Sequence, residues 1–366
     1  IFCYKQHLFR KAARKIEKLP NLKIIGVTGS FGKTTTKDFI ATILEEKFSV
    51  QKTPEHVNTE LGISKFVLNN LSESHEIFVV ELAAYKKGEI ARMCRILKPN
   101  IGVLTAIGIS HLALFGSERN ILNAKFELID SLPQNGVAIL NGDDPKIVTN
   151  SQKYNFKKVF FSAKKRVDIW ASQVAEKPEG LSFKLNIGKS SYFIQSPIIG
   201  GYNILNILAA VSVASELGMV HKDILEGIKK LKSPSSTMEV LESKNGSIII
   251  DDSYNINPTG VSLALDSLSY YPRFKKILIL SPMLELGTET EKSHQVVLKK
   301  ALAICDSVLW VGLDLVNIVK KFQTGEKLKI FKTSMLALKY IKEYDLKNTV
   351  FLCEGRNAKA VVEALL

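Results

Sequence analysis

Short runs of β-branched and other apolar residues alternate along this chain with longer segments of helical periodicity. The first four runs are LKIIGVTG (22–29), HEIFVVELAA (75–84), NIGVLTAIG (100–108) and GVAILNGDD (136–144). Strands separated by helices are typical of a parallel α/β sheet, because each parallel connection needs a crossover. We therefore expect a helix-covered sheet, in a chain whose 366 residues suffice for two domains.

This alternation is interrupted twice. Residues 157–199 hold close-spaced strands, with N-I-G-K-S (186–190) as a hairpin turn, and a helix follows from Asn203 to about Leu217. The polar, proline-containing segment KSPSST (232–237) marks a domain boundary, after which strand–helix alternation resumes. We expect a basic leading helix over 1–20, a central domain with a small β-rich part over 21–232, and a smaller Rossmann-like domain over 238–366.

The loop GVTGSFGKTTTK (26–37) joins the first strand to a helical segment. It departs from the usual phosphate-loop pattern G-x-x-x-x-G-K-[ST], which would place glycine where Val27 stands. Its glycines still let backbone N–H groups converge on phosphate oxygens, and the helix N-terminus favours an anion. Lys33 would face the β- and γ-phosphates, and Thr34 would offer its hydroxyl to Mg²⁺. We interpret the loop as a variant phosphate loop whose ATP-binding residues are Gly29, Ser30, Gly32, Lys33, Thr34 and Thr35.

The net charge of +14 raises the question of a nucleic-acid partner. Only 8 of the 50 basic residues are arginine and the lysines are scattered, which disfavours nucleic acid and suits anionic substrates or a membrane surface. The basic amphipathic segment 1–20 could lie beside a membrane, or could simply be a leading helix. Four cysteines without paired spacing indicate a reducing compartment, so we expect a cytoplasmic protein. We also expect a monomer, and any membrane association would be through a missing N-terminal segment or the basic segment 1–20.

Further motifs follow the loop in a fixed order, and together they resemble the Mur ligase family. Besides the loop, the segments that carry this resemblance are HVNTELGIS (56–64), VVELAAYKKGEI (79–90), TAIGISHLALFGS (105–117), NAKFELI (123–129), GYNILNILAAVSVA (201–214), DDSYNINP (251–258) and MLELG…H (283–294). The resemblance implies a central ATPase domain and a C-terminal Rossmann-like domain. The family's N-terminal domain, which holds the uridine diphosphate end of the substrate, has no counterpart in the first twenty residues.

The resemblance also implies an activity. Within the family, T-T-T-K is most similar to the branch that adds D-alanyl-D-alanine to a UDP-muramoyl tripeptide in peptidoglycan synthesis. Such an enzyme phosphorylates the donor carboxylate with ATP, and an amine then attacks the acyl phosphate. The implied ligands are ATP and Mg²⁺ at two sites. The implied substrates are a nucleotide-sugar peptide and an amino acid or dipeptide.

Several residues acquire roles by this resemblance. Glu81, at a strand end, would hold Mg²⁺ beside Thr34. His111 would hold a second metal, and Lys125 would serve as a carbamate ligand. Without the family, these three could be a surface glutamate, a structural histidine and a helix-surface lysine. We take Lys33, His111 and Lys125 as the catalytic group.

Other predicted residues lie on helices or in the second domain. Asn203 and Asn206, three apart on one helical face, could contact adenine, although Asn203 could instead cap the helix. Asp252 ends a strand where acidic groups commonly hold ribose hydroxyls, and Tyr254 and Asn257 would line the same nucleotide pocket. The acceptor side would include Glu285, His294, Glu354 and Arg356.

The chain departs from the family pattern at several positions, which leave the acceptor more open than the ATP site. The linker has Thr237 near the usual arginine, although Lys232 could supply the charge, and Ser281-Pro282 replaces Gly-Asp. Glu354-Gly355-Arg356 replaces Lys-Gly-Ser, a charge reversal that would repel a carboxylate or favour an amine-bearing acceptor. Tyr202 and Ala83 replace histidine and glycine. A divergent ligase with another acceptor or a non-muramoyl, membrane-bound donor therefore stays open, as does a phosphate-loop module that binds nucleotide without ligating.

Overall fold

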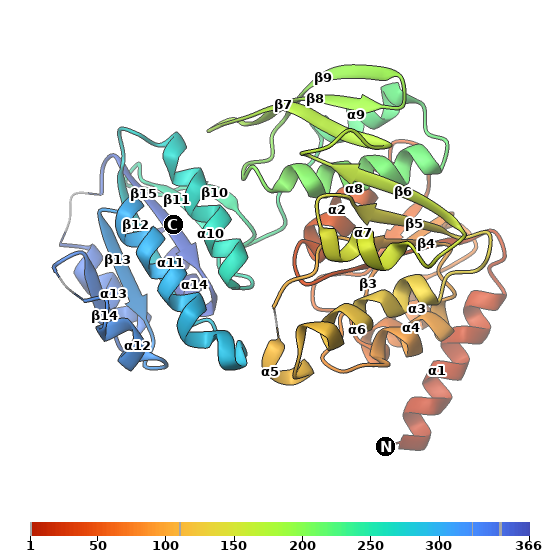
Figure 1. Ribbon diagram of the computed structural model, residues 1–366, viewed down its shortest axis with the longest axis horizontal. Coiled ribbons are helices and arrows are strands. Elements are labelled where there is room, and N and C mark those ends of the chain that lie inside the picture. The colour runs from red at the N-terminus through yellow and green to blue at the C-terminus, as the bar shows by residue number, and fades with distance from the viewer. Residues whose placement is uncertain (1, 110, 324, 344–345) are drawn as a thin grey trace. The chain divides into compact units, whose positions relative to one another are not determined.

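The computed structural model describes residues 2–109, 111–323, 325–343 and 346–366, so Ile1 of the predicted leading helix lies outside the described residues. The chain divides into two compact units (Figure 1). The first holds most of residues 1–232 and the second holds 233–366. Two short segments, Ala175–Leu181 and Ile198–Gly201, group with the second unit. The change from one unit to the other at Lys232 lies inside the polar segment KSPSST.

The first sheet has nine strands in the order β2-β3-β1-β4-β5-β6-β7-β8-β9. These strands are β1 (Lys23–Thr28), β2 (Val50–Lys52), β3 (Ile77–Glu81), β4 (Ile101–Leu104), β5 (Val137–Asn141), β6 (Lys157–Ser162), β7 (Ile169–Lys177), β8 (Gly180–Ile187) and β9 (Ser190–Ser196). From β2 to β7 every neighbouring pair is parallel, which confirms the predicted parallel sheet. The predicted hairpin joins β8 to β9 through two residues, Gly188 and Lys189.

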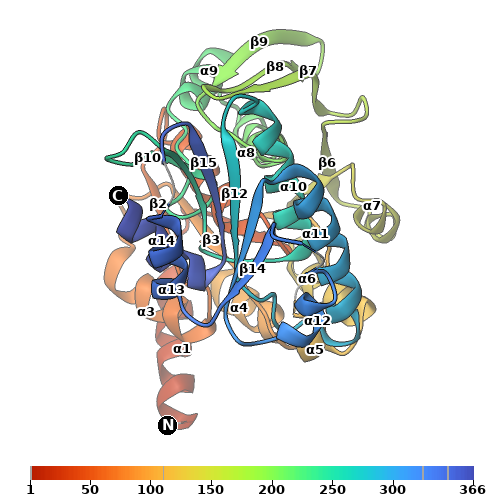
Figure 2. The same cartoon turned by 90° about the vertical axis from the view of Figure 1, so that its left-hand side faces the viewer.

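Helices cover both faces of this sheet (Figures 1 and 2). They are α1 (Phe2–Glu17), α2 (Lys33–Leu44), α3 (Glu60–Asn70), α4 (Glu89–Leu97), α5 (Leu112–Phe115), α6 (Glu118–Asp130), α7 (Pro145–Ser151), α8 (Asn203–Glu216) and α9 (His221–Lys229). One face, including Ile24, Phe78 and Val80, shares a hydrophobic core with α1, α3, α4 and α6. Helices α2, α8 and α9 pack together, and α8 lies against β5 and β6.

The second sheet has the order β10-β11-β15-β12-β13-β14. Its strands are β10 (Glu239–Glu242), β11 (Ile248–Asp252), β12 (Lys275–Leu280), β13 (Ser307–Val311), β14 (Leu328–Phe331) and β15 (Thr349–Glu354). Only β10 is antiparallel to its neighbour. The last strand, β15, lies between β11 and β12, so residues about a hundred positions apart meet at the carboxyl edge of this sheet.

Helices also line this second sheet (Figure 1). They are α10 (Pro258–Ser267), η1 (Leu268–Tyr270), η2 (Gly287–Glu289), α11 (Thr290–Ile304), α12 (Val316–Lys320), α13 (Ser334–Ile341) and α14 (Arg356–Leu365). Helices α13 and α14 form a hydrophobic core with one face of the sheet, and α10 packs against α11. The parallel core with crossover helices is the Rossmann-like arrangement that the sequence predicted.

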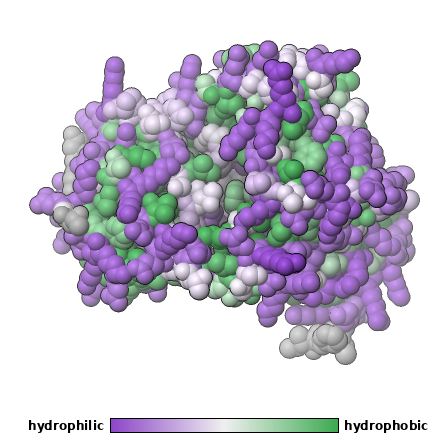
Figure 3. Space-filling model, in the orientation of Figure 1, coloured by the Kyte–Doolittle hydropathy of each residue, from purple (hydrophilic) through white to green (hydrophobic). Residues whose placement is uncertain are grey.

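The predicted leading helix is α1, and its apolar side is already occupied. Ala12 and Ile16 are buried in the first core, with Phe9 packed against it. Among the described residues, no helix combines the length and apolarity needed to cross a membrane. On the face seen in Figure 3, hydrophilic residues predominate and apolar ones are interspersed. These observations test neither membrane contact nor the monomeric state, so both stay predictions.

Candidate active site

The loop after β1 is held in shape by contacts to the segment after β4. Ser30 donates its backbone N–H to Ala106 O at 2.8 Å, and its Oγ accepts from Gly108 N at 2.9 Å. Thr105 Oγ1 donates to Phe31 O at 2.6 Å. Gly32 has φ 76°, a left-handed conformation in which side chains are strained. The loop is therefore preformed, with α2 beginning directly at Lys33.

The first turn of α2 brings Lys33 and Thr34 to the end of β3. Thr34 Oγ1 donates to Glu81 Oε2 at 2.8 Å, and Asn58 Nδ2 donates to Glu81 Oε1 at 3.1 Å. Lys33 Nζ donates to Ser30 O at 3.3 Å. Burial lowers the pKa of Lys33, while the charge of Glu81 opposes this shift. Glu81 is only 4% exposed, so the alternative of a surface glutamate is wrong.

Lys125 joins this group from α6. Its side chain is 4% exposed, so the alternative of a helix-surface lysine is also wrong. Its Nζ lies 5.8 Å from the centre of the Phe115 ring, and no carboxylate among the described residues lies within ion-pair distance of it. Burial lowers the pKa of Lys125 to about 7, helped by the charge of Lys33 and opposed by Glu81. The neutral amine of Lys125 is therefore accessible near neutral pH.

His111 precedes α5 with φ 60°, and its ring meets the Tyr85 ring edge-on, with 5.0 Å between their centres. In the described part of the chain, no three His, Cys, Asp or Glu side chains are grouped so that they could hold a metal ion. The predicted Mg²⁺ ligands that the structure brings together are instead one hydroxyl, Thr34, and one carboxylate, Glu81. The predicted metal role of His111 stays a prediction.

The two asparagines of α8 do lie on one face, as predicted. Asn206 Nδ2 donates to Asn203 Oδ1 at 2.7 Å, and Asn206 Oδ1 accepts from Thr36 Oγ1 at 3.0 Å. Tyr202 occupies the N-cap position of α8, so Asn203 does not cap this helix. In this arrangement Asn206 supports α2 and the loop that precedes it, and adenine contact stays a prediction for both asparagines.

In the second unit, the predicted nucleotide residues lie at the carboxyl end of β11. Asp252 is 8% exposed, and its Oδ1 accepts from Met238 N at 3.2 Å. Burial, with the charge of Asp251, raises the pKa of Asp252 to about 7. Tyr254 donates its backbone N–H to Ser236 O at 2.9 Å. Asn257 caps α10, because its Oδ1 accepts from Gly260 N at 2.9 Å.

The predicted acceptor residues of this unit have different environments. Glu354 is 1% exposed, whereas Arg356 is exposed and Glu285 is exposed with φ 64°. His294 is fully buried: its Nε2 accepts from Met283 N at 3.2 Å and its Nδ1 lies 2.7 Å from Thr290 O. Both ring nitrogens of His294 are therefore engaged within the unit, which makes it a support for the segment that begins at Met283.

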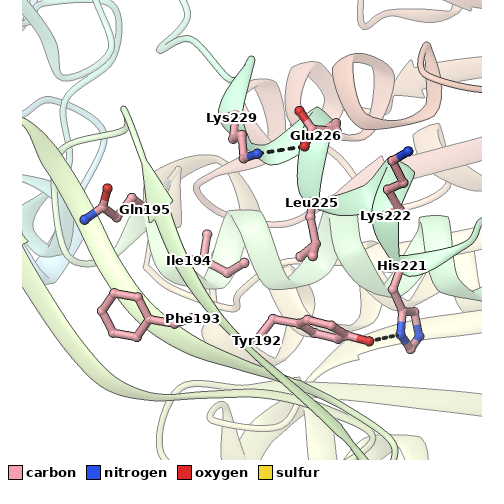
Figure 4. Close-up of a pocket in the computed structure, with 9 residues that line it drawn as sticks. All are labelled: Tyr192, Phe193, Ile194, Gln195, His221, Lys222, Leu225, Glu226 and Lys229. Carbon is pink, nitrogen blue, oxygen red and sulfur yellow. Dashed lines mark hydrogen bonds and ion pairs between the residues drawn. The ribbon is translucent and has the colours of Figure 1, made fainter.

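A cavity of about 440 Å³ lies elsewhere in the first unit, between β9 and α9 (Figure 4). Tyr192 and His221 join across it through a 2.7 Å hydrogen bond, and Ile194 and Leu225 lie between the two elements. None of the predicted site residues lines it. The predicted site therefore consists of the loop and strand ends rather than this cavity.

Two comparisons with protein families agree with this geometry. Residues 27–214 match the family described as the Mur ligase middle domain. Residues 238–357 match the Mur ligase, glutamate ligase domain. The chain belongs to the Mur ligase family.

Relatives within the Mur ligases have the same fold. The chain is 35% identical over 276 residues to UDP-N-acetylmuramoyl-tripeptide–D-alanyl-D-alanine ligase of Bacillus subtilis, covering 75% of this chain and 59% of that protein. The structure of MurF from Acinetobacter baumannii superposes with a TM-score of 0.90 at 27% identity, covering 99% of this chain and 80% of that one. MurF of Thermotoga maritima in complex with ADP gives 0.88 at 27% identity, covering 99% and 82%. The chain spans about three fifths of the length of the curated relatives that it matches.

Two residues near the loop of this Mur ligase were not singled out from the sequence. Asn58 positions Glu81, and the only signal was its place in the asparagine segment HVNTELGIS. Glu127 accepts from Gly88 N at 2.6 Å and Ala91 N at 3.0 Å, which ties α6 to the first turn of α4. No local pattern predicts that contact, because the bonded residues are 39 and 36 positions apart along the chain.

Proposed function

We propose that this Mur ligase is an ATP-dependent amide-bond ligase that adds D-alanyl-D-alanine to a UDP-muramoyl tripeptide through an acyl phosphate. The observation that carries the proposal is the convergence of Lys33, Thr34, Glu81 and Lys125 in the first unit. The donor and acceptor are proposed from the relatives, whose names specify that reaction. We assign the phosphates of ATP to the loop of residues 21–232, nucleotide contacts to Asp252, Tyr254 and Asn257, and the acceptor side to Glu285, His294, Glu354 and Arg356.

The residues of the loop suit phosphoryl transfer. Charge accumulates on phosphoryl oxygens throughout this reaction, so preplaced N–H groups and cations stabilise the transition state. The backbone around Gly29, Ser30 and Gly32 would hold the phosphates, and Lys33 would neutralise the transferred group. The half-buried Lys33, whose pKa is lowered, gains from an anionic ligand, since such a ligand stabilises its charged form.

The same residues fit Mg²⁺. Thr34 and Glu81 present hard oxygen atoms 2.8 Å apart, which is the donor type that Mg²⁺ prefers. When bound there, Mg²⁺ would neutralise phosphate charge. Asn58 would fix the orientation of the Glu81 carboxylate, leaving its second oxygen beside Thr34.

Lys125 fits the proposed carbamate. Carbamate formation joins a neutral amine to CO₂ through a new N–C bond and releases one proton. The pKa of about 7 keeps the neutral amine of Lys125 available at physiological pH. The product would replace a buried cation with an anion beside Lys33, which relieves the repulsion between the two lysines. A module that only binds nucleotide has no need of this buried amine, which favours a ligase.

A second acceptor is the alternative that a specific observation favours. Glu354 is a buried carboxyl where the family pattern has lysine. A carboxyl there would repel the carboxylate of D-alanyl-D-alanine if the acceptor reaches it. The alternative is a Mur-type ligase with the same ATP chemistry and an acceptor or donor of another kind.

Phosphate release tests the proposal. The full chain would be incubated with ATP and Mg²⁺, UDP-muramoyl tripeptide, and D-alanyl-D-alanine either present or omitted. We expect release only with both substrates and a product heavier by the dipeptide. Release with a different amine would support the alternative acceptor. No release with any donor and acceptor pair would contradict ligation.

A further inference from the structure

The segment of residues 105–108, which follows β4, packs directly against the phosphate loop. An added Cβ on Gly29 would lie 2.0 Å from Thr105 Oγ1. One added on Gly108 would lie 3.1 Å from the Phe31 ring. Close-packed groups transmit small displacements to one another, because no space between them can absorb the movement. The position of the loop therefore depends on the position of segment 105–108.

Two side chains from the end of β5 hold this segment. In the sheet, β4 lies between β1 and β5, so the loop after β1 and the turn after β5 flank the segment. Asn141 Nδ2 donates to Thr105 O at 2.8 Å, and Asp144 Oδ2 accepts from Ile107 N at 2.8 Å. Thr105, Ile107 and Asn141 are buried, so water competes little for these two hydrogen bonds.

Both side chains are themselves fixed. Asn141 Oδ1 accepts from Asp143 N at 2.9 Å, and because Thr105 O can only accept, the Asn141 amide has one orientation. Asp144 Oδ1 accepts from Lys146 N at 2.9 Å and so caps α7. The two oxygens of Asp144 therefore serve two elements, and the segment is tied to a strand end and to a helix.

We propose that Asn141 and Asp144 are positioning residues for the phosphates of ATP: from the end of β5 they fix segment 105–108, and this segment fixes the phosphate loop. The inference rests on the proposed function, in which the loop holds the phosphates. Backbone N–H groups stabilise phosphoryl oxygens best when they already point at them, because reorientation costs free energy. Loss of either contact therefore weakens the grip of the loop on the β-phosphate.

Asp144→Asn removes one contact of Asp144 and keeps the other. The variant retains one oxygen acceptor, and we expect it to serve the cap of α7, where asparagine is a favoured residue. The amide nitrogen then faces Ile107 N, so two donors meet and that hydrogen bond is lost. The substitution thus releases segment 105–108 without unwinding the helix.

Asp143→Asn is the matched control in the same turn. Asp143 is half-buried like Asp144, but its Oδ2 accepts from Ala163 N, directly after β6, at 2.9 Å. The same isosteric change and the same loss of charge therefore fall on a different strand end. Segment 105–108 keeps both of its contacts to β5 in this variant.

The experiment measures ADP and AMP binding to the full chain by calorimetry in the presence of Mg²⁺. ADP differs from AMP by the β-phosphate, so the ratio of the two affinities reports the grip of the loop. We expect Asp144→Asn to lower this ratio about tenfold, the size of one lost charge-assisted hydrogen bond, with AMP affinity unchanged. Asp143→Asn should keep the wild-type ratio. An unchanged ratio in Asp144→Asn, or an equal fall in the control, would overturn the proposal.

Asn141→Ser tests the second contact and serves if Asp144→Asn does not fold. It removes the donor to Thr105 O, so the ratio should fall here too, and a wild-type ratio would contradict the role of Asn141. The failure of the proposed function has a different signature. A chain that binds both nucleotides but forms no amide contradicts ligation, and the affinity ratio still tests the positioning.

If neither nucleotide binds, amide hydrogen exchange tests the positioning without a ligand. Ser30 N donates to Ala106 O at 2.8 Å, so this amide opens when the segment moves. Asp144→Asn should speed exchange at Ser30 N and Ile107 N about tenfold, whereas the first turn of α7 keeps its wild-type rate. Asp143→Asn should change neither amide. Unchanged exchange at Ser30 N in Asp144→Asn would overturn the proposal.

Discussion

The carboxyl edges of the two sheets hold ionisable groups of opposite kinds. In the first unit, the half-buried Lys33 and the buried Lys125 are amines with lowered pKa values, and Glu81 is the carboxylate whose charge opposes both shifts. In the second unit, Asp252 and Glu354 are buried carboxyls with raised pKa values and no described basic partner. Both edges occupy the position where open α/β sheets bind ligands. The difference indicates that an anionic ligand would suit the first edge, whereas burial favours the neutral, protonated carboxyls at the second edge.

The first edge should be the more sensitive to loss of charge. Lys33→Ala removes the cation aimed at the transferred phosphate, and we expect phosphate release to fall by about 10³-fold, the size typical of a lost transition-state contact. Steady-state kinetics at saturating ATP measure this loss. Lys65→Ala, an exposed lysine of α3, is the control and should retain activity. Phosphate release that survives in Lys33→Ala would remove the basis for the proposed ATP chemistry.

Lys125 should show a dependence on dissolved CO₂ that Lys33 does not. If its carbamate takes part, Lys125→Arg should lose about 10²-fold in turnover, because a guanidinium stays protonated and cannot form it. The wild type should lose activity in CO₂-depleted buffer and recover it when bicarbonate is added. The variant should respond to neither treatment. Wild-type turnover that is indifferent to CO₂ would leave Lys125 as an unmodified amine.

A substitution in the phosphate loop should have a smaller effect than the loss of either lysine. Gly32 has φ 76°, and an added Cβ would lie 2.6 Å from Asn206 Oδ1. We expect Gly32→Ala to destabilise the first unit by about 2 kcal/mol, from backbone strain together with the displaced Asn206 amide. Gly218→Ala is a matched control, since Gly218 has φ 71° with nothing within 4 Å of the added Cβ. Urea unfolding of both variants measures the difference, and equal losses would mean that the Asn206 contact contributes nothing.

The sequence predicted the long, regular features of both units. The parallel strands β1, β3 and β4 were found because continuous apolar runs are typical of strands buried on both faces. Strands β2 and β10 were missed, since VQK and EVLE are short and largely polar. Local pattern carries little information about such edge strands.

The sequence also predicted one part of the candidate site and not the rest. Thr34 and Glu81 were expected to lie together, and Thr34 Oγ1 is 2.8 Å from Glu81 Oε2. The sequence could predict this contact because its motifs identify both the start of α2, where Thr34 lies, and the end of β3, where Glu81 lies. The pairing of Asp252 with Glu354 could not be predicted, since it depends on β15 lying between β11 and β12. The engagement of both His294 nitrogens was missed for the same reason, because burial is a property of the packed unit rather than of the segment.

Substitution of His294 should have the smallest effect on stability. It also distinguishes the pH dependence that comes from His294 from the pH dependence that comes from the carboxyls of the second unit. Burial lowers the pKa of His294, against the Thr290 carbonyl, which raises it. The unfolded chain therefore binds more protons at this site, and stability from His294 is complete above about pH 6.5 and declines as pH falls below it. The carboxyl pair gives the opposite slope between about pH 4 and pH 7. The two responses must therefore be measured as differences from variants.

His294→Phe removes the proton uptake and leaves Met283 N without its acceptor, at a cost of about 1 kcal/mol at pH 8. Trp310, whose ring lies 5.6 Å from that of His294, reports unfolding of this unit by fluorescence in a Trp170→Phe background. The gap between wild type and variant should narrow as pH falls from 7 to 5, whereas His7→Gln, at an exposed position, should show no such change. A constant gap would mean that His294 keeps the same proton count folded and unfolded, and the pH response of this unit would then belong to its carboxyls.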